Sequence, residues 1–497
     1  MKMLRSYYFM FLAAIIAVFC LLVEGFIVRT SAGKIRGVLR DLDGVGYRLY
    51  AGIPYAEAPI GRLRFAAPVA RKSWQGIRNA TRYGPSCPQN ISNVAKFYPD
   101  YVVRIPDEAM VVSEDCLSLN VFAPGDCSSS SGLAVMVWVH GGSYATGQGS
   151  GYDASALAVR GRVVVVTINY RLNVFGFLST NDENAPGNYG LLDQQLALQW
   201  VHENIAGFGG DPSRVTLFGQ SAGGAAATLH LFAPNSRRLF QRVGAIGGYF
   251  EPSHAASGPR MRQYANVVGR NMNCTHDTTT DLVQCLRERT MHELLAAGLE
   301  LEQALILPVI WGPVIDGHLL FPHHVASNDS LDLHHDLMIS FCTGDGSVIL
   351  EALPFISPRE LNLSVGVTPL QWTRFLTYLW RTPLQQEAIG FAYPALDDPS
   401  RGRAIVDLMT DWNFLADVPS TLDKVTTVRS VYMSVFDYRS SANTRYPWLQ
   451  PSPHSEDLSY IFGLPYNASG LGSRFTTQET ALSNRLITYW SNFAKSG

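Results

Sequence analysis

Short apolar runs alternate with helical patterns along the central part of the chain. The runs 133–139 ("LAVMVWV") and 163–169 ("VVVVTIN") are almost continuously apolar and rich in β-branched residues, which is typical of strands buried on both faces. A helical pattern crosses 190–204, and the strand-like run 215–218 leads directly into a second helical pattern at 222–232. This alternation predicts a doubly wound α/β fold, with a mostly parallel sheet between layers of helices.

The helical pattern at 190–204 also predicts which side of that helix is buried. Leu192, Leu196 and Trp200 recur at helical spacing, whereas the polar Gln194 lies off that stripe. We therefore expect an amphipathic helix that packs its leucine-bearing face against the sheet.

Length and composition fit one large globular unit. The 497 residues could form two or three average domains, or one α/β domain with insertions. No linker divides the chain, so we expect a single domain over 26–497. The composition is 47% hydrophobic and 16% charged, with a formal net charge of -2, and it shows no basic stripe for nucleic acid. Nucleic-acid binding is therefore excluded.

The N-terminus has the form of a targeting segment. Lys2 and Arg5 precede an apolar run at 7–23, and the small Gly25 follows it. This pattern predicts a secretory signal peptide over 1–25 and a secreted protein. An uncleaved membrane anchor is the alternative, because the run is only slightly shorter than the roughly 20 residues that span a bilayer.

Asparagine sequons agree with secretion. Each has the Asn-x-Ser/Thr form that accepts N-linked glycans on exposed loops of secreted proteins. The six predicted glycosylation sites are Asn79, Asn90, Asn273, Asn328, Asn362 and Asn467.

The cysteines predict disulfides, since an oxidising compartment favours them and no C-x-x-C pair is present. Cys274 and Cys285 bracket a short polar loop and form the best local pair, followed by Cys87 and Cys116. Two others outside the N-terminal segment have no evident partner: Cys127 and Cys342.

The segment "GQSAG" (219–223) lies at the junction between the strand-like run and the helix. A serine at a sharp strand-to-helix turn needs small flanking residues, because a Cβ at Gly219 or Gly223 would collide with neighbouring backbone. The turn exposes the Ser221 hydroxyl, and the helix directs its unpaired N–H groups towards any charge that forms there. The context predicts a nucleophile.

A nucleophile of this kind needs backbone donors for a developing oxyanion. Gly141 and Gly142 follow the strand 133–139, and their amides can approach a substrate together with the N–H of Ala222. An ordinary Gly-Gly turn is the alternative interpretation. We interpret His140 as a residue that anchors this loop.

Ser221 also needs a base and an acid that orients it, in the chain order serine, acid, histidine. Of the twelve histidines, His454 is the one late in the chain, in "PSPHSEDLSYIFG". The pairs 323–324 and 334–335 lie in polar sequence without ligand spacing, so we expect solvated surface there and no metal or cofactor.

The acid has three candidates. The apolar run 337–342 predicts a buried strand that ends at Gly-Asp-Gly, which places Asp345 at the strand's carboxyl edge. Asp316 and Glu351 are alternatives, and Asp345 as a plain turn residue is another reading.

Together these segments resemble the cholinesterase/type B carboxylesterase family of α/β-hydrolases. The resemblance runs from about residue 26 to the end and depends on the order and number of the motifs. They are "GIPYAEAPIGRLRF" (52–65), "SEDCLSLNVFAP" (113–124), "HGGSY" (140–144), "INYRLNVFGFLS" (168–179), "GNYGLLDQQLALQWV" (187–201), "FGGDPSRVTLFGQSAGG" (208–224), "PVIDG" (313–317) and "HSEDLSYIFG" (454–463).

The resemblance implies a serine hydrolase with a triad, an oxyanion hole and two disulfides. The residues it assigns are Ser221, Asp345 and His454 for the triad, Gly141, Gly142 and Ala222 for the hole, and the pairs Cys87–Cys116 and Cys274–Cys285.

Departures from the family pattern bear on the substrate. Asp345 replaces the usual glutamate, and Gln220 stands where cholinesterases have a glutamate that helps to hold a cation. Pro106 takes the place of the cation-stacking tryptophan, and Val348 and Ile349 replace aromatic residues beside the acid. Loss of aromatic faces removes cation–π binding, which favours neutral esters over choline esters.

Two further departures affect other expectations. Gly247 replaces a serine that the family commonly has near the active histidine, and the chain stops at "WSNFAKSG", earlier than is usual in the family. We therefore expect a truncated C-terminal end, with membrane attachment only through a missing tail or an uncleaved N-terminal segment.

The leading hypothesis is a secreted serine carboxylesterase that acts on small-molecule esters without a cofactor. The alternatives are a cholinesterase and, from another class, a non-catalytic adhesion or binding protein on the same fold.

Overall fold

The computed structural model describes most of the chain. The predicted signal peptide lies outside the described residues, which are 27–93, 103–249, 255–275, 277–305, 310–320, 334–352, 365–380, 382–416, 418–419, 422, 429–466 and 472–497.

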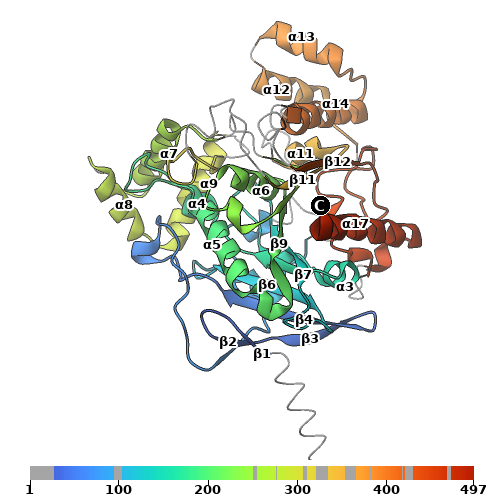
Figure 1. Cartoon of the computed structure of the whole chain (residues 1–497). Coiled ribbons are helices and arrows are strands. Elements are labelled where there is room, and N and C mark those ends of the chain that lie inside the picture. Colours follow the sequence, from blue (N-terminus) through green and yellow to red (C-terminus); the bar gives the residue numbers. More distant parts are fainter. Residues whose placement is uncertain are drawn as a thin grey trace, which may run out of the picture.

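The centre of the fold is a nine-stranded sheet with the strand order β12-β11-β10-β9-β7-β8-β6-β4-β3 (Figure 1). The strands from β12 to β8 are parallel, and β6, β4 and β3 continue the sheet in antiparallel pairs. The predicted α/β fold with a mostly parallel sheet is confirmed. The strands are β3 Val38–Leu42, β4 Val45–Pro54, β6 Ser118–Pro124, β7 Leu133–Val139, β8 Val164–Ile168, β9 Gly210–Gln220, β10 Arg242–Ile246, β11 Asp336–Cys342 and β12 Ser430–Phe436.

A small second sheet lies at the N-terminal edge of the molecule. It joins three short strands in the order β1-β2-β5. Their bounds are β1 Ile27–Arg29, β2 Lys34–Arg36 and β5 Ile77–Asn79.

Helices cover both faces of the large sheet. Along β7, Val135, Val137 and Val139 belong to one apolar core, whereas Met136 and Trp138 point into a second core on the opposite face. Helices α5 and α6 pack on the first face, and α3 and α17 on the second (Figure 1). The main helices are α3 Ser155–Gly161, α4 Asn173–Phe177, α5 Tyr189–Asn204, α6 Ala222–Phe232, α7 Gly258–Asn271, α8 Thr279–Arg287, α9 Met291–Leu305, α16 Leu458–Ile461 and α17 Thr477–Ser496.

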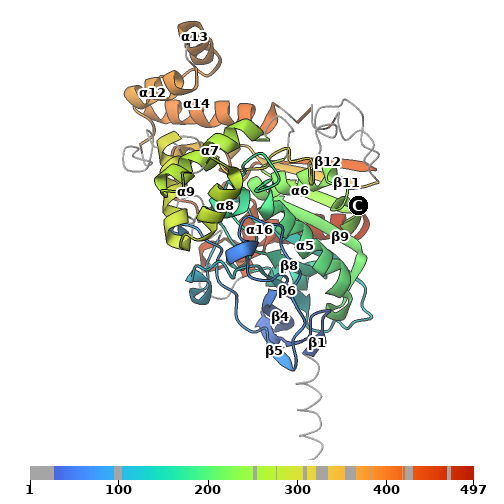
Figure 2. The ribbon, with the colours of Figure 1, turned by 90° about the vertical axis from the view of Figure 1, so that its left-hand side faces the viewer.

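A separate helical group extends beyond the carboxyl edge of the sheet (Figure 2). It consists of α11 Val348–Ala352, α12 Pro369–Leu379, α13 Pro383–Ala392 and α14 Asp398–Thr410. Leu350, Phe375 and Ile405 form part of its own apolar core. Because α14 packs directly against the turn that begins at Asp345, this group supports the candidate acid from behind.

The buried face of α5 differs in part from the predicted one. Leu192 and Leu196 are only partly buried, whereas Gln194 is completely buried. Its Oε1 accepts a hydrogen bond from Nε2 of His230, at 3.0 Å, on the neighbouring α6. The prediction was right only in part: Leu192 and Leu196 pack against the core and Trp200 is buried, but the helix also buries Gln194, which the sequence pattern placed off the buried stripe.

Two disulfides tie loops to this framework. Cys87 bonds to Cys116, and Cys274 bonds to Cys285, the pairs that the resemblance implies. Among the cysteines that the structure describes, Cys127 and Cys342 are buried and form no disulfide.

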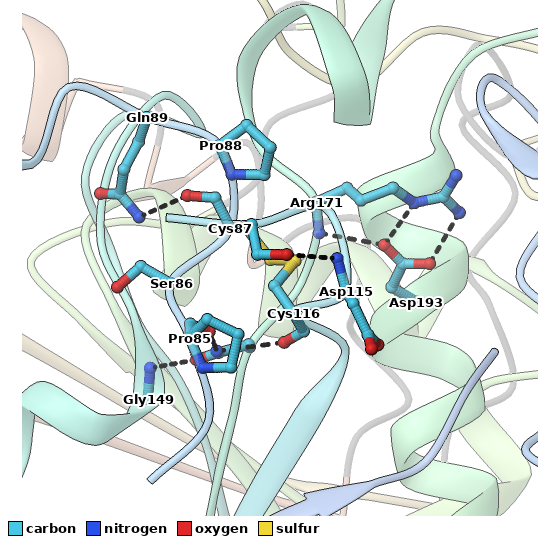
Figure 3. The surroundings of a disulfide bond; sticks show 12 residues. Pro85, Ser86, Cys87, Pro88, Gln89, Asp115, Cys116, Gly149, Arg171 and Asp193 are labelled. Carbon is cyan, nitrogen blue, oxygen red and sulfur yellow. Dashed lines mark hydrogen bonds and ion pairs between the residues drawn. A yellow bond between two sulfur atoms is a disulfide. The ribbon is translucent and has the colours of Figure 1, made fainter. Parts of the chain in front are cut away.

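A buried ion pair lies beside the first disulfide (Figure 3). Nε and Nη2 of Arg171 contact the two carboxylate oxygens of Asp193, at 2.8 and 2.7 Å. Both side chains are almost completely buried. The pair fixes the loop after β8 to α5, and removing one partner of such a pair leaves an uncompensated buried charge.

Burial of His230 predicts a pH dependence of stability. Burial lowers the pKa of His230 to about 3 from an ordinary value near 6.5, so the folded protein keeps it neutral where the unfolded chain binds a proton. The contribution of the neutral His230 to the free energy of unfolding is complete above pH 6.5 and decreases as the pH falls towards 3. Between pH 4 and 6, the His230→Gln variant should show a shallower slope of unfolding free energy against pH, by up to about 1.4 kcal/mol per unit.

Urea titrations at several pH values measure this slope. The variant His202→Gln, which changes an exposed histidine on α5, controls for the substitution itself. Equal slopes for wild type and His230→Gln would contradict the prediction.

Candidate active site

The turn between β9 and α6 holds Ser221 in a strained backbone conformation. Its φ is 55° and its ψ is -128°, which is unusual for a residue with a side chain. A Cβ at Gly219 would lie 2.4 Å from the Gly223 carbonyl oxygen, and one at Gly223 would lie 2.1 Å from that of Val139. The two glycines are therefore required by backbone crowding, which maintains the sharp turn predicted from the sequence.

His454 and Asp345 lie together at the carboxyl edge of the sheet. His454 Nδ1 donates to Asp345 Oδ1 at 2.7 Å, and Asp345 Oδ2 accepts from the backbone N–H of Cys342 at 2.9 Å. Asp345 is completely buried, and 6% of the His454 side chain is exposed. The structure thus brings together the predicted base and the first candidate for the acid.

The other candidate acids behave differently. Asp316 Oδ1 accepts from the backbone N–H groups of three following residues, and its Oδ2 accepts from Asn188, so it stabilises its own turn. The side chain of Glu351 lies outside the described residues.

The loop that carries Asp345 (the acid loop) and the loop that carries His454 (the histidine loop) are joined by hydrogen bonds. Gly344 N–H donates to the carbonyl oxygen of Ser452 at 2.8 Å, and Ser452 N–H donates to Thr343 Oγ1 at 3.0 Å. His454 N–H donates to Ser347 Oγ at 2.9 Å. These bonds draw the two loops together, so that the shorter aspartate reaches the imidazole.

The space around the other imidazole nitrogen is occupied by neighbouring side chains. Gln220 Nε2 lies 2.8 Å from His454 Nε2, and the Phe414 ring lies 5.3 Å from the imidazole, centroid to centroid. Among the hydrogen bonds of the described residues, none joins Ser221 Oγ to His454. The sequence did not predict either contact, because Gln220 and Phe414 reach the histidine only through tertiary packing.

The predicted oxyanion donors lie at the entrance to α6 and at the end of β7. Gly142 has a φ of 106°, and a Cβ there would lie 2.1 Å from the Thr146 carbonyl oxygen. Within the described part of the chain, no acceptor takes the N–H groups of Gly141, Gly142 or Ala222. These donors are available for an anion.

His140 supports this loop, as predicted. It is completely buried, donates from Nδ1 to the Gly141 carbonyl oxygen at 2.8 Å, and stacks on Tyr170 at 4.4 Å between ring centroids. Burial lowers the pKa of His140 to about 4, so the imidazole is neutral at pH 7. It orients the first glycine of the loop and carries no charge into the site.

Two further residues lie close to the Asp345–His454 pair, of which the sequence had placed only Gly247 near the active histidine. A Cβ at Gly247 would lie 2.9 Å from Asp345 Oδ1 and 3.3 Å from His454 Cε1, so the glycine permits a close approach. Asp457 is buried beside the Cys342 thiol, and burial, with the nearby charge of Asp345, raises its pKa to about 8. The motif that contains Asp457 does not show that its carboxyl group is buried beside Cys342.

The histidine pairs give a mixed result. His335 is buried, with Nε2 2.8 Å from the Arg237 carbonyl oxygen and its ring 5.2 Å from that of Phe240, which corrects the expectation of a solvated pair. His334 is exposed, and 323–324 lie outside the described residues. The described residues contain no cluster of three or more potential metal ligands.

Three of the predicted glycosylation sites can be placed. Asn79, Asn90 and Asn273 are exposed, whereas 328, 362 and 467 lie outside the described residues. Among the helices that the structure describes, none is both long and apolar enough to cross a bilayer.

In this protein a strand of a mostly parallel sheet leads through a strained serine into a helix, and an aspartate–histidine pair follows on later loops. This arrangement defines the α/β-hydrolase fold class. The chain belongs to the carboxylesterase family, whose family model matches residues 24–497.

Curated relatives agree with this family. Neuroligin-2 of Mus musculus is 33% identical over 95% of this chain, which spans 60% of that relative. Carboxylesterase 1D of Rattus norvegicus is 32% identical over 95% of this chain, which spans 85% of that relative. Neuroligin-3 of Mus musculus is 33% identical, with 61% of its length covered. The chain thus spans about three fifths of the neuroligins that it matches.

The crowding at the serine turn predicts the effect of one added methyl group. Gly223→Ala should destabilise the protein by about 1–3 kcal/mol or more, because its Cβ would meet backbone atoms that cannot rotate away. Thermal unfolding measures the loss. Gly390→Ala on α13, where nothing lies within 4 Å, is the matched control and should leave the midpoint unchanged or slightly higher. Equal midpoints for the two variants would contradict the crowding argument.

Proposed function

We propose that the protein is a serine carboxylesterase in which Ser221, His454 and Asp345 form the catalytic triad. The observation that carries this proposal is the His454–Asp345 bond of 2.7 Å, positioned beside the serine turn. A non-catalytic protein has no need to keep a strained serine next to an oriented imidazole.

The reaction follows from these positions. Ser221 Oγ attacks the ester carbonyl carbon while His454 Nε2 accepts the hydroxyl proton. Asp345 holds the imidazole in the tautomer with hydrogen on Nδ1 and stabilises the imidazolium that forms. Both roles use the bond already present.

The charge that develops on the carbonyl oxygen is met by the N–H groups of Gly141, Gly142 and Ala222. His454 then protonates the departing alcohol, and the acyl group stays on Ser221. Water, deprotonated by the same imidazole, hydrolyses the acyl-enzyme and restores the serine.

The substrates that this site favours are neutral carboxylic esters. Ile349 is buried and Val348 is partly buried directly after the acid loop, and both are aliphatic. Gln220 contacts the histidine and carries no charge that could hold a quaternary ammonium. Aliphatic and uncharged residues at these positions, where cholinesterases of the family have aromatic and acidic ones, favour neutral esters over choline esters.

Secretion belongs to the same proposal. Residues 1–25 are a cleaved signal peptide, and 26–497 form the esterase domain, with glycans on the sequon asparagines. Two disulfides and three exposed sequons support an extracellular route.

A binding protein without catalysis is the second candidate. The similarity to neuroligin-2 favours it, because that relative, unlike carboxylesterase 1D, is not named as an esterase, and its identity of 33% is slightly above the 32% of carboxylesterase 1D. The filled triad positions favour the enzyme.

Loss of the nucleophile tests the assignment of the triad. Ser221→Ala should reduce kcat for p-nitrophenyl butyrate by about 10³-fold or more, and Asp345→Asn should reduce it by about 10³- to 10⁴-fold, with thermal midpoints unchanged. Ser213→Ala, an exposed serine on the same strand, is the control and should retain full activity. Undiminished turnover in Ser221→Ala would refute the triad, and absence of turnover in folded wild type would favour the binding protein.

The substrate preference has its own test. The ratio of kcat/KM for acetylthiocholine to that for a neutral acetyl thioester of equal size should be at or below one, with Ser221→Ala as the blank. A strong preference for the cation would show that other residues build a choline site.

A further inference from the structure

The side chain of Gln220 contacts Nε2 of His454, the atom that must act as the base. Gln220 is the last residue of β9 and is completely buried, and its Nε2 lies 2.8 Å from His454 Nε2. Its backbone pairs with Ile246 of β10, and the N–H of Ser221 donates to the Ile246 carbonyl oxygen at 2.8 Å. The strand therefore holds the amide and the serine in adjacent positions before the histidine.

The direction of this hydrogen bond follows from the other side of the ring. The Asp345 carboxylate can only accept, so His454 Nδ1 carries the ring hydrogen at the 2.7 Å contact. In the neutral imidazole Nε2 then has a lone pair and no hydrogen. Gln220 must donate its amide N–H to that lone pair.

We propose that Gln220 caps the base in the resting protein and thereby restrains Ser221. One lone pair cannot fully accept from both the amide and the serine hydroxyl, and proton transfer from Ser221 requires that the amide be displaced. Gln220 is then a positioning residue that sets the resting reactivity of the nucleophile. This inference rests on the proposed triad.

The chemistry of residue 220 makes the cap specific to an amide. A glutamate in the same place would be a carboxylate, which can only accept and so would favour a hydrogen on Nε2 and a charged imidazolium. A methionine has nearly the same length but offers no donor. Methionine removes the hydrogen bond and glutamate reverses its direction, while both keep the shape of the side chain.

The test is the rate at which a fluorophosphonate inactivates the full-length protein. Gln220→Met should react about three- to tenfold faster than wild type at pH 7, as expected for the loss of one neutral hydrogen bond. Gln220→Glu should react more slowly at pH 7. On the acidic limb of its pH profile, the pH at which the inactivation rate falls to half should be higher by about one unit.

A matched control is present in the same molecule. Gln194 and His230 form another buried glutamine–histidine bond, 3.0 Å long, away from the triad. Gln194→Met should leave the inactivation rate unchanged, so a general loss of packing cannot imitate the expected pattern.

The outcomes separate the two proposals. Labelling that is not accelerated in Gln220→Met, or a pH limb that does not move in Gln220→Glu, would overturn the cap while leaving the esterase intact. Folded wild type and variants that all resist the fluorophosphonate would instead overturn the triad itself. If Gln220→Met fails to fold, the pH limb of Gln220→Glu decides the question of the cap.

Discussion

The site depends on one steric constraint, the contact of backbone with backbone at the turn between β9 and α6. Ser221 can keep a positive φ only because the residues two positions before and after it have no Cβ. That close approach brings α6 against the end of β7, where Gly141 and Gly142 lie. The position of the serine and the position of the N–H donors are thus consequences of the same packing.

The site also depends on contacts between the acid loop and the histidine loop, which are distant in the sequence. Hydrogen bonds from Gly344, Ser452 and His454 join the acid loop to the histidine loop, and α14 supports the turn from behind. This arrangement explains how an aspartate can take the place of the longer glutamate. It also brings the imidazole within reach of Gln220. The same position of the histidine loop therefore allows both the bond to Asp345 that orients the base and the bond from Gln220 that caps it.

The sequence predicted the elements with strong local patterns and missed the contacts between them. The β-branched run that became β8 and the helix α6 were placed almost to the residue, since burial and turn chemistry are local properties. The buried face of α5 was predicted only in part, because Gln194 is buried through its hydrogen bond to His230 on another helix. The candidates for the acid could be separated only when the structure showed that Asp345 contacts His454 and that Asp316 serves its own turn.

The central claim is that Ser221 acts as a covalent nucleophile. The most direct measurement is mass spectrometry of the protein quenched in acid within milliseconds of mixing with p-nitrophenyl butyrate, followed by digestion. We expect a butyryl group on the peptide that contains Ser221 and on no other serine peptide. Release of p-nitrophenol from folded protein, with no acyl group on that peptide, would contradict the central claim.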